Sequence, residues 1–195
     1  YNKVISGLEK GALNMVSLAV AIATAGIIVG AVASTGLSNN LVIIVEAISG
    51  GNVITLLLLT ALLCIILGMG LPTTANYLVV AALMAQVVVE VGSASGYVFP
   101  LIAIHLFVFY YGLMADVTPP VGLASYAAAA ISKADPIKTG VQAFWYSLRT
   151  GILPIVFIFN SELLLIGIEN IWHGLTVVIT SLVAILIFTS ATQGW

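Results

Sequence analysis

Long apolar blocks, separated by short polar clusters, fill this sequence. Residues 12–35 and 172–190 contain only small polar interruptions. At a rise of ~1.5 Å per residue, each block is long enough to cross the ~30 Å hydrocarbon core of a bilayer. The pattern therefore predicts an all-α, polytopic membrane protein whose first and last long blocks are transmembrane helices.

Four further segments are predicted between these two helices. Residues 53–90 form a helical hairpin, either re-entrant or made of two tight spans, because its first arm covers only about 22 Å. Residues 97–132 are too long for one straight helix and are interrupted at 116–122. Asp135 followed by Pro136 is typical of a helix start, so we expect a surface helix over 136–146 and a further transmembrane helix over 150–167.

The basic residues decide how often residues 97–132 cross the membrane. Lys133, Lys138 and Arg149 follow this segment, whereas Lys3 and Lys10 precede the first transmembrane helix. One broken crossing puts both basic groups on the same face, as the positive-inside rule prefers, and two crossings separate them. We therefore predict one transmembrane helix broken near the midplane, with the surface helix on the cytoplasmic face.

Composition supports the membrane assignment and excludes several functions. The chain is 62% hydrophobic and 6% charged, with a mean hydropathy of +1.23, too apolar for a soluble domain of this length. Nothing supports a nucleic-acid partner. The single cysteine, Cys64, is expected to be a packing residue. Since the chain lacks an initial Met and a signal peptide, and stops just after an apolar block, residues 1–195 are expected to be part of a longer polypeptide.

Two polar interruptions at membrane depth are the candidate functional site. Residues 68–77 and 116–122 break apolar helices, and unpaired backbone groups in hydrocarbon cost several kcal/mol each unless they line a wet cavity or are buried in protein. Pairs of Pro-interrupted segments are a pointer to the binding site of a secondary transporter. The alternative is that both interruptions are merely kinks.

Each interruption ends one half-helix and begins another. Thr73 or Thr74 at the first, and Thr118 followed by Pro119 at the second, are expected to cap the starting ends, whose free N–H groups suit a carboxylate substrate. The terminating ends near residues 68–70 and 115 offer carbonyl oxygens. With Thr hydroxyls and the side chains of Asn76 and Asp116, these oxygens suit a small cation, for which sodium is the natural candidate.

Other ionisable residues have competing interpretations. Asp116 could coordinate a cation, carry a proton or pair structurally, and an intramembrane carboxylate is usually functional. Glu162 is expected within an unbroken helix, where it makes a structural hydrogen bond in preference to a substrate contact. His105 is expected to be a packing histidine, and the chain offers too few ligands for a transition-metal site. No phosphate loop, dinucleotide fingerprint or nucleophile motif appears, so no enzyme activity and no organic cofactor are expected.

The motifs at these positions resemble those of the large membrane subunit of tripartite ATP-independent periplasmic (TRAP) transporters, especially the branch in which small and large subunits are fused. The resemblance covers nearly the whole chain and rests on four segments. They are LGMGLPTTANY (67–77), HLFVFYYG (105–112), ADVTPPVG (115–122) and FIFNSEL (157–163).

This resemblance implies the second inverted repeat of an elevator-type transporter in the bacterial inner membrane. It further implies sodium-driven uptake of organic acids that a periplasmic binding protein delivers. The remainder of the permease, with its first repeat and small-subunit helices, would supply the other flank of the site, including any basic side chain. The residues implied to hold one sodium ion and one flank of the substrate site are Gly68, Gly70, Thr73, Thr74, Asn76, Asp116, Thr118 and Gly122.

A channel that uses the two breaks as a filter is the main rival function, and a non-transporting scaffold is the third. A channel conducts without coupling, whereas a transporter accumulates substrate against a gradient. A scaffold would tolerate substitution of Asp116 and Thr73. Because both half-sites need a partner repeat, we expect the chain to be inactive in isolation.

Overall fold

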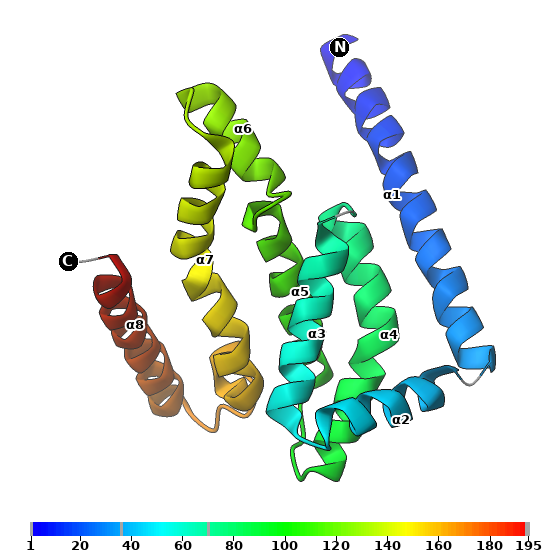
Figure 1. Ribbon diagram of the computed structural model, residues 1–195, viewed down its shortest axis with the longest axis vertical. Helices are drawn as coiled ribbons and strands as arrows, with labels where there is room; N and C mark the ends of the chain where they lie inside the picture. The colour runs from blue at the N-terminus through cyan, green and yellow to red at the C-terminus, as the bar shows by residue number, and fades with distance from the viewer. Residues whose placement is uncertain (1, 36, 70, 194–195) are drawn as a thin grey trace.

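The structure, a computed structural model, describes residues 2–35, 37–69 and 71–193 as a set of helices with no strand among them. Figure 1 shows their arrangement. In chain order they are α1 (Asn2–Thr35), α2 (Leu37–Ser49), α3 (Val53–Gly68), α4 (Thr73–Ala94), α5 (Leu101–Met114), the 3₁₀ turn η1 (Ala115–Val117), α6 (Leu123–Ser132), α7 (Pro136–Phe159), the 3₁₀ turn η2 (Ser161–Leu164) and α8 (Ile171–Gln193).

Helices α3 and α4 form a hairpin in the middle of the molecule (Figure 1). Asn52 begins α3, because its side-chain oxygen accepts hydrogen bonds from the backbone N–H groups of the first turn. At the other end of α4, the Ser95 hydroxyl donates to the carbonyl of Gly51 at 3.0 Å. The two arms are thus joined at their base as well as at the tip.

The segment predicted to be a broken helix is broken. Helix α5 ends at Met114, the turn η1 follows, and residues 118–122 form a loop before α6 begins at Leu123. A cis peptide bond joins Pro119 to Pro120 within this loop. Helix α5 packs against α3, α4 and α7, and η1 packs against the end of α3. The break in one helix therefore lies against the tip of the hairpin.

The region after Pro136 differs from its prediction. Helix α7 runs without interruption from Pro136 to Phe159, so the expected surface helix over 136–146 and the expected transmembrane helix over 150–167 are one helix that ends eight residues early. No helix-breaking residue lies between the two expected helices, and the Ser147 hydroxyl donates a hydrogen bond to the Phe144 carbonyl within α7. The helix ends at Asn160. The side-chain amide of Asn160 donates a hydrogen bond to the Val156 carbonyl, and its backbone adopts a non-helical conformation.

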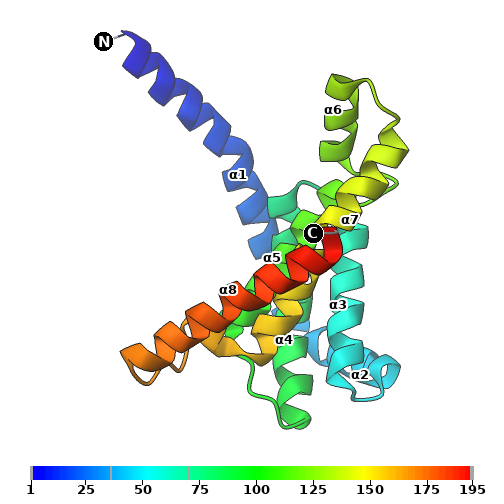
Figure 2. The same ribbon diagram turned by 90° about the vertical axis from the view of Figure 1, so that its left-hand side faces the viewer.

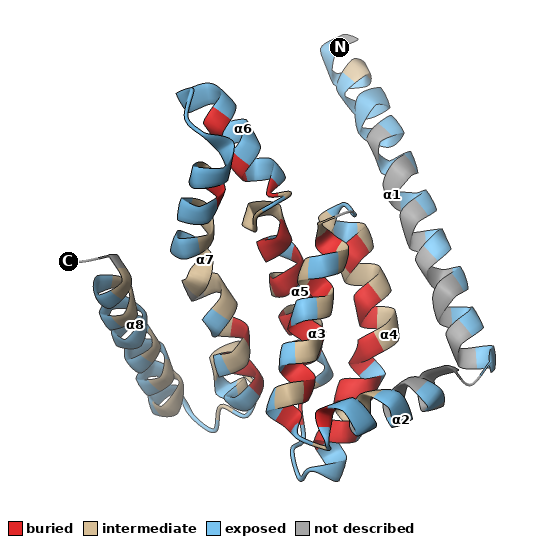
Figure 3. Ribbon diagram, viewed as in Figure 1, coloured by how far each residue is buried: buried red, intermediate tan, exposed pale blue. Residues whose placement is uncertain are grey.

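The buried side chains concentrate on the hairpin and α5 (Figure 3). Leu56, Val80, Ile104 and Phe107 are among the residues that are almost completely buried. Helix α8 stands at the edge, and none of its described residues is buried (Figures 2 and 3). Because lipid tails are as apolar as these side chains, close fit and hydrogen bonds hold the centre together here, more than hydrophobicity does.

Helices α4, α7 and α8 are long and apolar enough to cross a membrane, judged by length and composition over the described residues. A bent pair, formed by the end of α2 and α3 at 112° to one another, is a fourth candidate crossing. The expected crossing over 172–190 lies within α8, and the expected crossing over 12–35 lies within α1. That the hairpin enters and leaves the membrane on the same face stays a prediction.

Candidate functional site

The two breaks in the helices meet through a direct side-chain contact. The Thr73 hydroxyl, at the first residue of α4, donates a hydrogen bond to Oδ2 of Asp116 in η1 at 3.0 Å. The two residues are 43 positions apart in sequence, and both are partly buried. The hairpin tip and the broken helix are therefore in direct contact at a carboxylate.

This approach depends on a glycine at the end of α3. A Cβ atom at Gly68 would lie 2.5 Å from Cβ of Ala115 and 2.6 Å from Nδ2 of Asn76. Carbon atoms in contact are normally about 3.5–4.0 Å apart, so no larger residue fits without displacement. Gly112 on α5 is a milder case, because a Cβ there would lie 3.2 Å from the same amide nitrogen. Asn76 thus lies between two glycines of neighbouring helices.

Asn76 is completely buried and serves the hairpin itself. Its Nδ2 donates to the carbonyl of Cys64 on the opposite arm at 2.8 Å, in addition to the helical bond that this carbonyl accepts within α3. Its Oδ1 has no hydrogen-bond partner although it is inaccessible to solvent. A buried acceptor without a protein partner is rare, and such an oxygen can bind a water molecule or a cation. The prediction that Asn76 belongs to the site is thus compatible with its position between α3, α4 and α5.

The expected helix caps are wrong at both breaks. Helix α4 begins at Thr73 after Pro72, and no side chain caps it, so neither Thr73 nor Thr74 is a cap. Helix α6 begins at Leu123 after Gly122, not at Pro119, and it also lacks a side-chain cap. The physical reason at Thr73 is position, because Thr73 is already the first helical residue and Pro72, which has no hydroxyl, occupies the cap position.

Thr118 belongs to the end of α5 and not to the start of the next helix. Its hydroxyl donates to the carbonyl of Met114 at 2.6 Å, and its N–H donates to the carbonyl of Ala115 at 3.3 Å. The carbonyls expected to be free at this end are therefore already engaged, although a carbonyl oxygen keeps a second lone pair. Gly122 closes the turn by donating its N–H to the Thr118 carbonyl at 3.0 Å.

Pro119 faces away from the hairpin tip. A Cβ on Gly140 of α7 would lie 3.2 Å from Cγ of Pro119 and 3.7 Å from Cβ of Ser125. Ser125, which the sequence analysis missed, is 3% exposed, and its hydroxyl has no partner. The available signal was a hydroxyl one turn into an Ala-rich helix that directly follows the break. Pro119 is thus a packing contact between the loop and α7.

The remaining predicted residues lie apart from the Thr73–Asp116 contact. Thr74 is exposed, and Gly70 lies outside the described residues. Glu162, expected within an unbroken helix, lies instead in η2 and pairs with His173 of α8, with 3.3 Å between Oε2 and Nε2. The break after Phe159 explains this difference. His105 makes a 3.0 Å hydrogen bond between its Nδ1 and the Tyr77 hydroxyl across α4 and α5.

The donor set at the two breaks consists of oxygen atoms. It comprises the Asp116 carboxylate, the Thr73 hydroxyl and the unpartnered Oδ1 of Asn76. Over the described part of the chain, no group of three or more His, Cys, Asp or Glu side chains is close enough to hold a metal ion. A single carboxylate with neutral oxygens suits a hard cation of low charge.

A helical hairpin whose tip contacts a broken helix, in a chain this apolar, defines an integral membrane protein of the transporter class. Residues 1–172 match the sequence model of the family described as "Tripartite ATP-independent periplasmic transporter, DctM component". The chain belongs to this family, and it is therefore a membrane component of a TRAP transporter. No curated protein and no solved structure matches the chain.

Proposed function

We propose that the chain forms part of a secondary transporter that couples sodium entry to the uptake of small organic acids. In this proposal a periplasmic binding protein delivers the acid to the transporter at the bacterial inner membrane. The observation that carries the proposal is the hydrogen bond between Thr73 and Asp116, because it joins two helix breaks around a carboxylate. An intramembrane carboxylate is costly and is usually retained for function.

The sodium ion would be held by oxygen atoms of both breaks. Asp116 supplies the charge, and Thr73 and Asn76 supply neutral oxygens from the hairpin side. Gly68 permits the approach of these groups, and the Thr118–Gly122 turn holds Asp116 at the end of α5. Binding of the cation from both sides would pull the hairpin tip onto the broken helix, which links ion binding to closure of the site.

The organic acid would be bound by helix ends. Helices α4 and α6 both start without a side-chain cap, so the N–H groups of their first turns remain available to an anion. All five Lys and Arg residues, at positions 3, 10, 133, 138 and 149, lie outside the two breaks. A carboxylate substrate therefore depends on these helix ends and on groups from other parts of the transporter.

The test measures uptake of radiolabelled organic acids by the assembled transporter in liposomes, with its binding protein, under a sodium gradient, a proton gradient or none. Asp116→Asn removes the charge at constant size. Thr73→Val removes the hydroxyl at nearly constant shape, and Thr73→Ser retains it. Glu90→Gln is the matched control for Asp116→Asn, since Glu90 is exposed and bonds only within α4 through Gln86.

We expect sodium-dependent accumulation that falls roughly tenfold or more in Asp116→Asn and Thr73→Val, since hydrogen bonds to charged groups contribute about 1.5–3 kcal/mol. Thr73→Ser and Glu90→Gln should transport like the parent protein. Uptake that only equilibrates would support a channel. Accumulation that depends on a proton gradient alone would refute sodium coupling. If Asp116→Asn takes up the acid as fast as the wild-type protein, the two breaks do not take part in the mechanism.

A further inference from the structure

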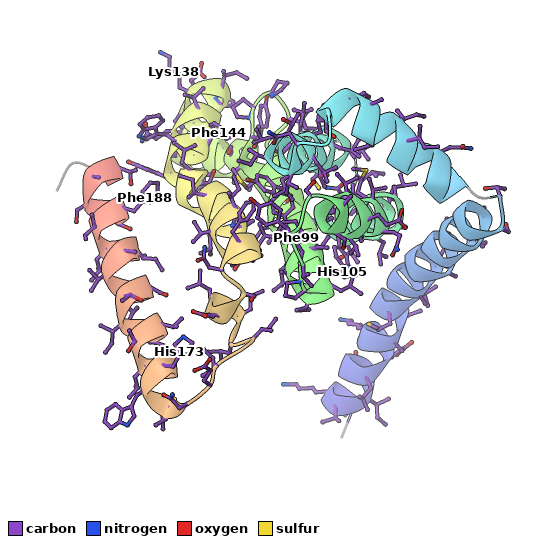
Figure 4. All side chains as sticks on the ribbon, turned by 90° about the horizontal axis from the view of Figure 1, so that it is seen from below. Phe99, His105, Lys138, Phe144, His173 and Phe188 are labelled. Atoms are coloured by element: carbon purple, nitrogen blue, oxygen red, sulfur yellow. The ribbon has the colours of Figure 1, made fainter. Side chains whose placement is uncertain are left out.

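A groove between α7 and α8 is separate from the two breaks. It has a volume of about 890 Å³ and is bounded by Tyr110 of α5 and by residues between Thr150 and Leu163, which belong to α7 and the turn η2 that follows it. On α8 it is bounded by one helical face, which runs at three- and four-residue spacing from Val177 to Thr189. Figure 4 shows the two helices side by side, with His173 and Phe188 marking opposite ends of α8.

The walls of this groove are mostly apolar. The Thr180 and Ser181 hydroxyls donate to the carbonyls of Thr176 and Val177 in their own helix, and the Asn160 amide donates to that of Val156. These polar groups are therefore satisfied without an occupant. From Val177 to Thr189 the groove extends for 12 residues, or about 18 Å along α8. An apolar chain of that length fits such walls.

One end of the groove carries a charge. Glu162 lines it, is 50% exposed, and contacts His173 through only one of its two oxygens. A carboxylate accepts about four hydrogen bonds, so capacity remains for a donor. The neighbouring Trp172 is 75% exposed. Tryptophan prefers the boundary between headgroups and hydrocarbon, so Glu162 lies at headgroup depth, on the face opposite the basic residues Lys133 and Lys138.

We propose that this groove binds one phospholipid with a primary ammonium headgroup, such as phosphatidylethanolamine. The ammonium group donates to Glu162, the phosphate lies next to the first turn of α8, and an acyl chain follows the groove toward Phe188. The unused lone pairs of Glu162 at one end of the groove favour an occupant with a cationic donor over an uncharged apolar helix. The lipid thereby joins α8, which has no buried described residue, to α7.

The test uses the assembled transporter in nanodiscs of equimolar dioleoyl phosphatidylethanolamine, phosphatidylglycerol and phosphatidylcholine. Native mass spectrometry after stepwise delipidation counts the lipids that are retained. Glu162→Gln removes the charge of the headgroup site. Glu169→Gln is its matched control, because Glu169 is exposed in the same loop and does not line the groove. Ala184→Phe fills the groove itself.

We expect one phosphatidylethanolamine to be retained at least about fivefold over the other lipids, corresponding to about 1 kcal/mol. Glu162→Gln should abolish this preference, Glu169→Gln should keep it, and Ala184→Phe should reduce retention of every lipid. In the wild-type protein, stepwise N-methylation of the ethanolamine should lower retention progressively, because each methyl group removes a donor at constant charge.

Two results would overturn the proposal. One is equal retention of the three lipids by the wild-type protein, which is also the outcome if a neighbouring helix covers the groove. The other is a methylation series that leaves retention unchanged, which would show that no N–H donor reaches a carboxylate. Since both measurements use wild-type protein, neither depends on whether a variant folds. They are also independent of the coupling ion, so a failure of sodium coupling leaves this inference standing.

Discussion

Replacement of Gly68 by Ala is the sharpest test of the contact between the hairpin and the broken helix. The added Cβ would lie 2.5 Å from Cβ of Ala115 and 2.6 Å from Nδ2 of Asn76. Relief of the first contact alone requires a displacement of about 1.0–1.5 Å, because carbon atoms prefer separations of about 3.5–4.0 Å. The neighbouring atoms belong to a short side chain on η1 and a buried amide, and neither can swing aside.

The displacement has two costs. Overpacking of a well-fitted interior typically costs about 1–3 kcal/mol. If Asn76 moves away from the Cys64 carbonyl, its buried side-chain amide also loses its acceptor, at about 1–3 kcal/mol. We therefore expect the free energy of unfolding to fall by about 2–6 kcal/mol, and the hydrogen bond between Thr73 and Asp116 to lengthen as the tip moves away.

The assay compares three Gly→Ala variants by thermal unfolding in detergent and by uptake in liposomes. Gly112→Ala should be milder than Gly68→Ala, because its Cβ would lie 3.2 Å from the amide nitrogen. Gly11→Ala is the control, since nothing lies within 4 Å of a Cβ at that position. The order of stability should be Gly11→Ala above Gly112→Ala above Gly68→Ala. If Gly68→Ala unfolds at the wild-type temperature and transports normally, the close approach of α3 to η1 is refuted.

Three further substitutions test contacts that hold the site in place. Asn52→Ala should lower the free energy of unfolding by about 0.5–2 kcal/mol, because it removes the cap of α3. Asn52→Asp should retain most of the wild-type stability in the same thermal assay, since Asp also caps helices. Equal loss of stability in both variants would contradict the capping role. Tyr111→Phe removes a 2.6 Å hydrogen bond to the Gly151 carbonyl between α5 and α7 and should cost about 0.5–1.5 kcal/mol, whereas an unchanged unfolding temperature would show the bond to be dispensable. A double-mutant cycle of Tyr77→Phe and His105→Ala should give a coupling energy of about 0.5–1.5 kcal/mol, and additive effects would show that their hydrogen bond contributes nothing.

The sequence predicted the positions of both breaks because Gly and Pro clusters stand out against apolar blocks. It also indicated that Asp116 and Thr73 belong to one site, although no local pattern relates residues 43 positions apart. That inference came from the shared chemistry of the two breaks and from the family resemblance. Their hydrogen bond is a tertiary contact between α4 and η1, and it depends on how the hairpin packs against the broken helix.

The errors at the helix starts share one cause. Thr73 and Thr118 have the residue type of a cap, and sequence patterns treat a hydroxyl next to a helix start as its capping group. In the structure neither residue occupies the cap position, because α4 begins at Thr73 itself and α6 begins only at Leu123. The two hydroxyls donate instead to the Asp116 carboxylate and to the Met114 carbonyl, and residue type alone does not locate a helix start to within one residue.

The missed end of α7 has a different origin. Hydropathy continues through Leu163–Ile168, so an apolar count predicts that the helix continues as well. Backbone geometry decides otherwise, since Asn160 leaves the helix and Leu165 and Gly167 adopt positive φ values. This irregular segment brings Glu162 next to His173. Because the sequence predicts a continuous helix here, it does not predict that a carboxylate lies at one end of the groove between α7 and α8.

The nitrogen and the oxygen of the Asn76 side-chain amide differ in their partners, and this difference suggests how ion binding could be linked to closure of the hairpin. Its amide nitrogen holds the Cys64 carbonyl and so fixes the two arms of the hairpin to each other, whereas its oxygen has no partner. A buried acceptor left unpaired costs about 1–3 kcal/mol, which a bound cation would recover. Because the same cation would also bind Asp116, its binding energy is available only while the tip lies against the broken helix. In the proposed function, the unpaired oxygen would therefore favour an open hairpin without sodium and a closed one with it, which is the linkage that coupled transport requires.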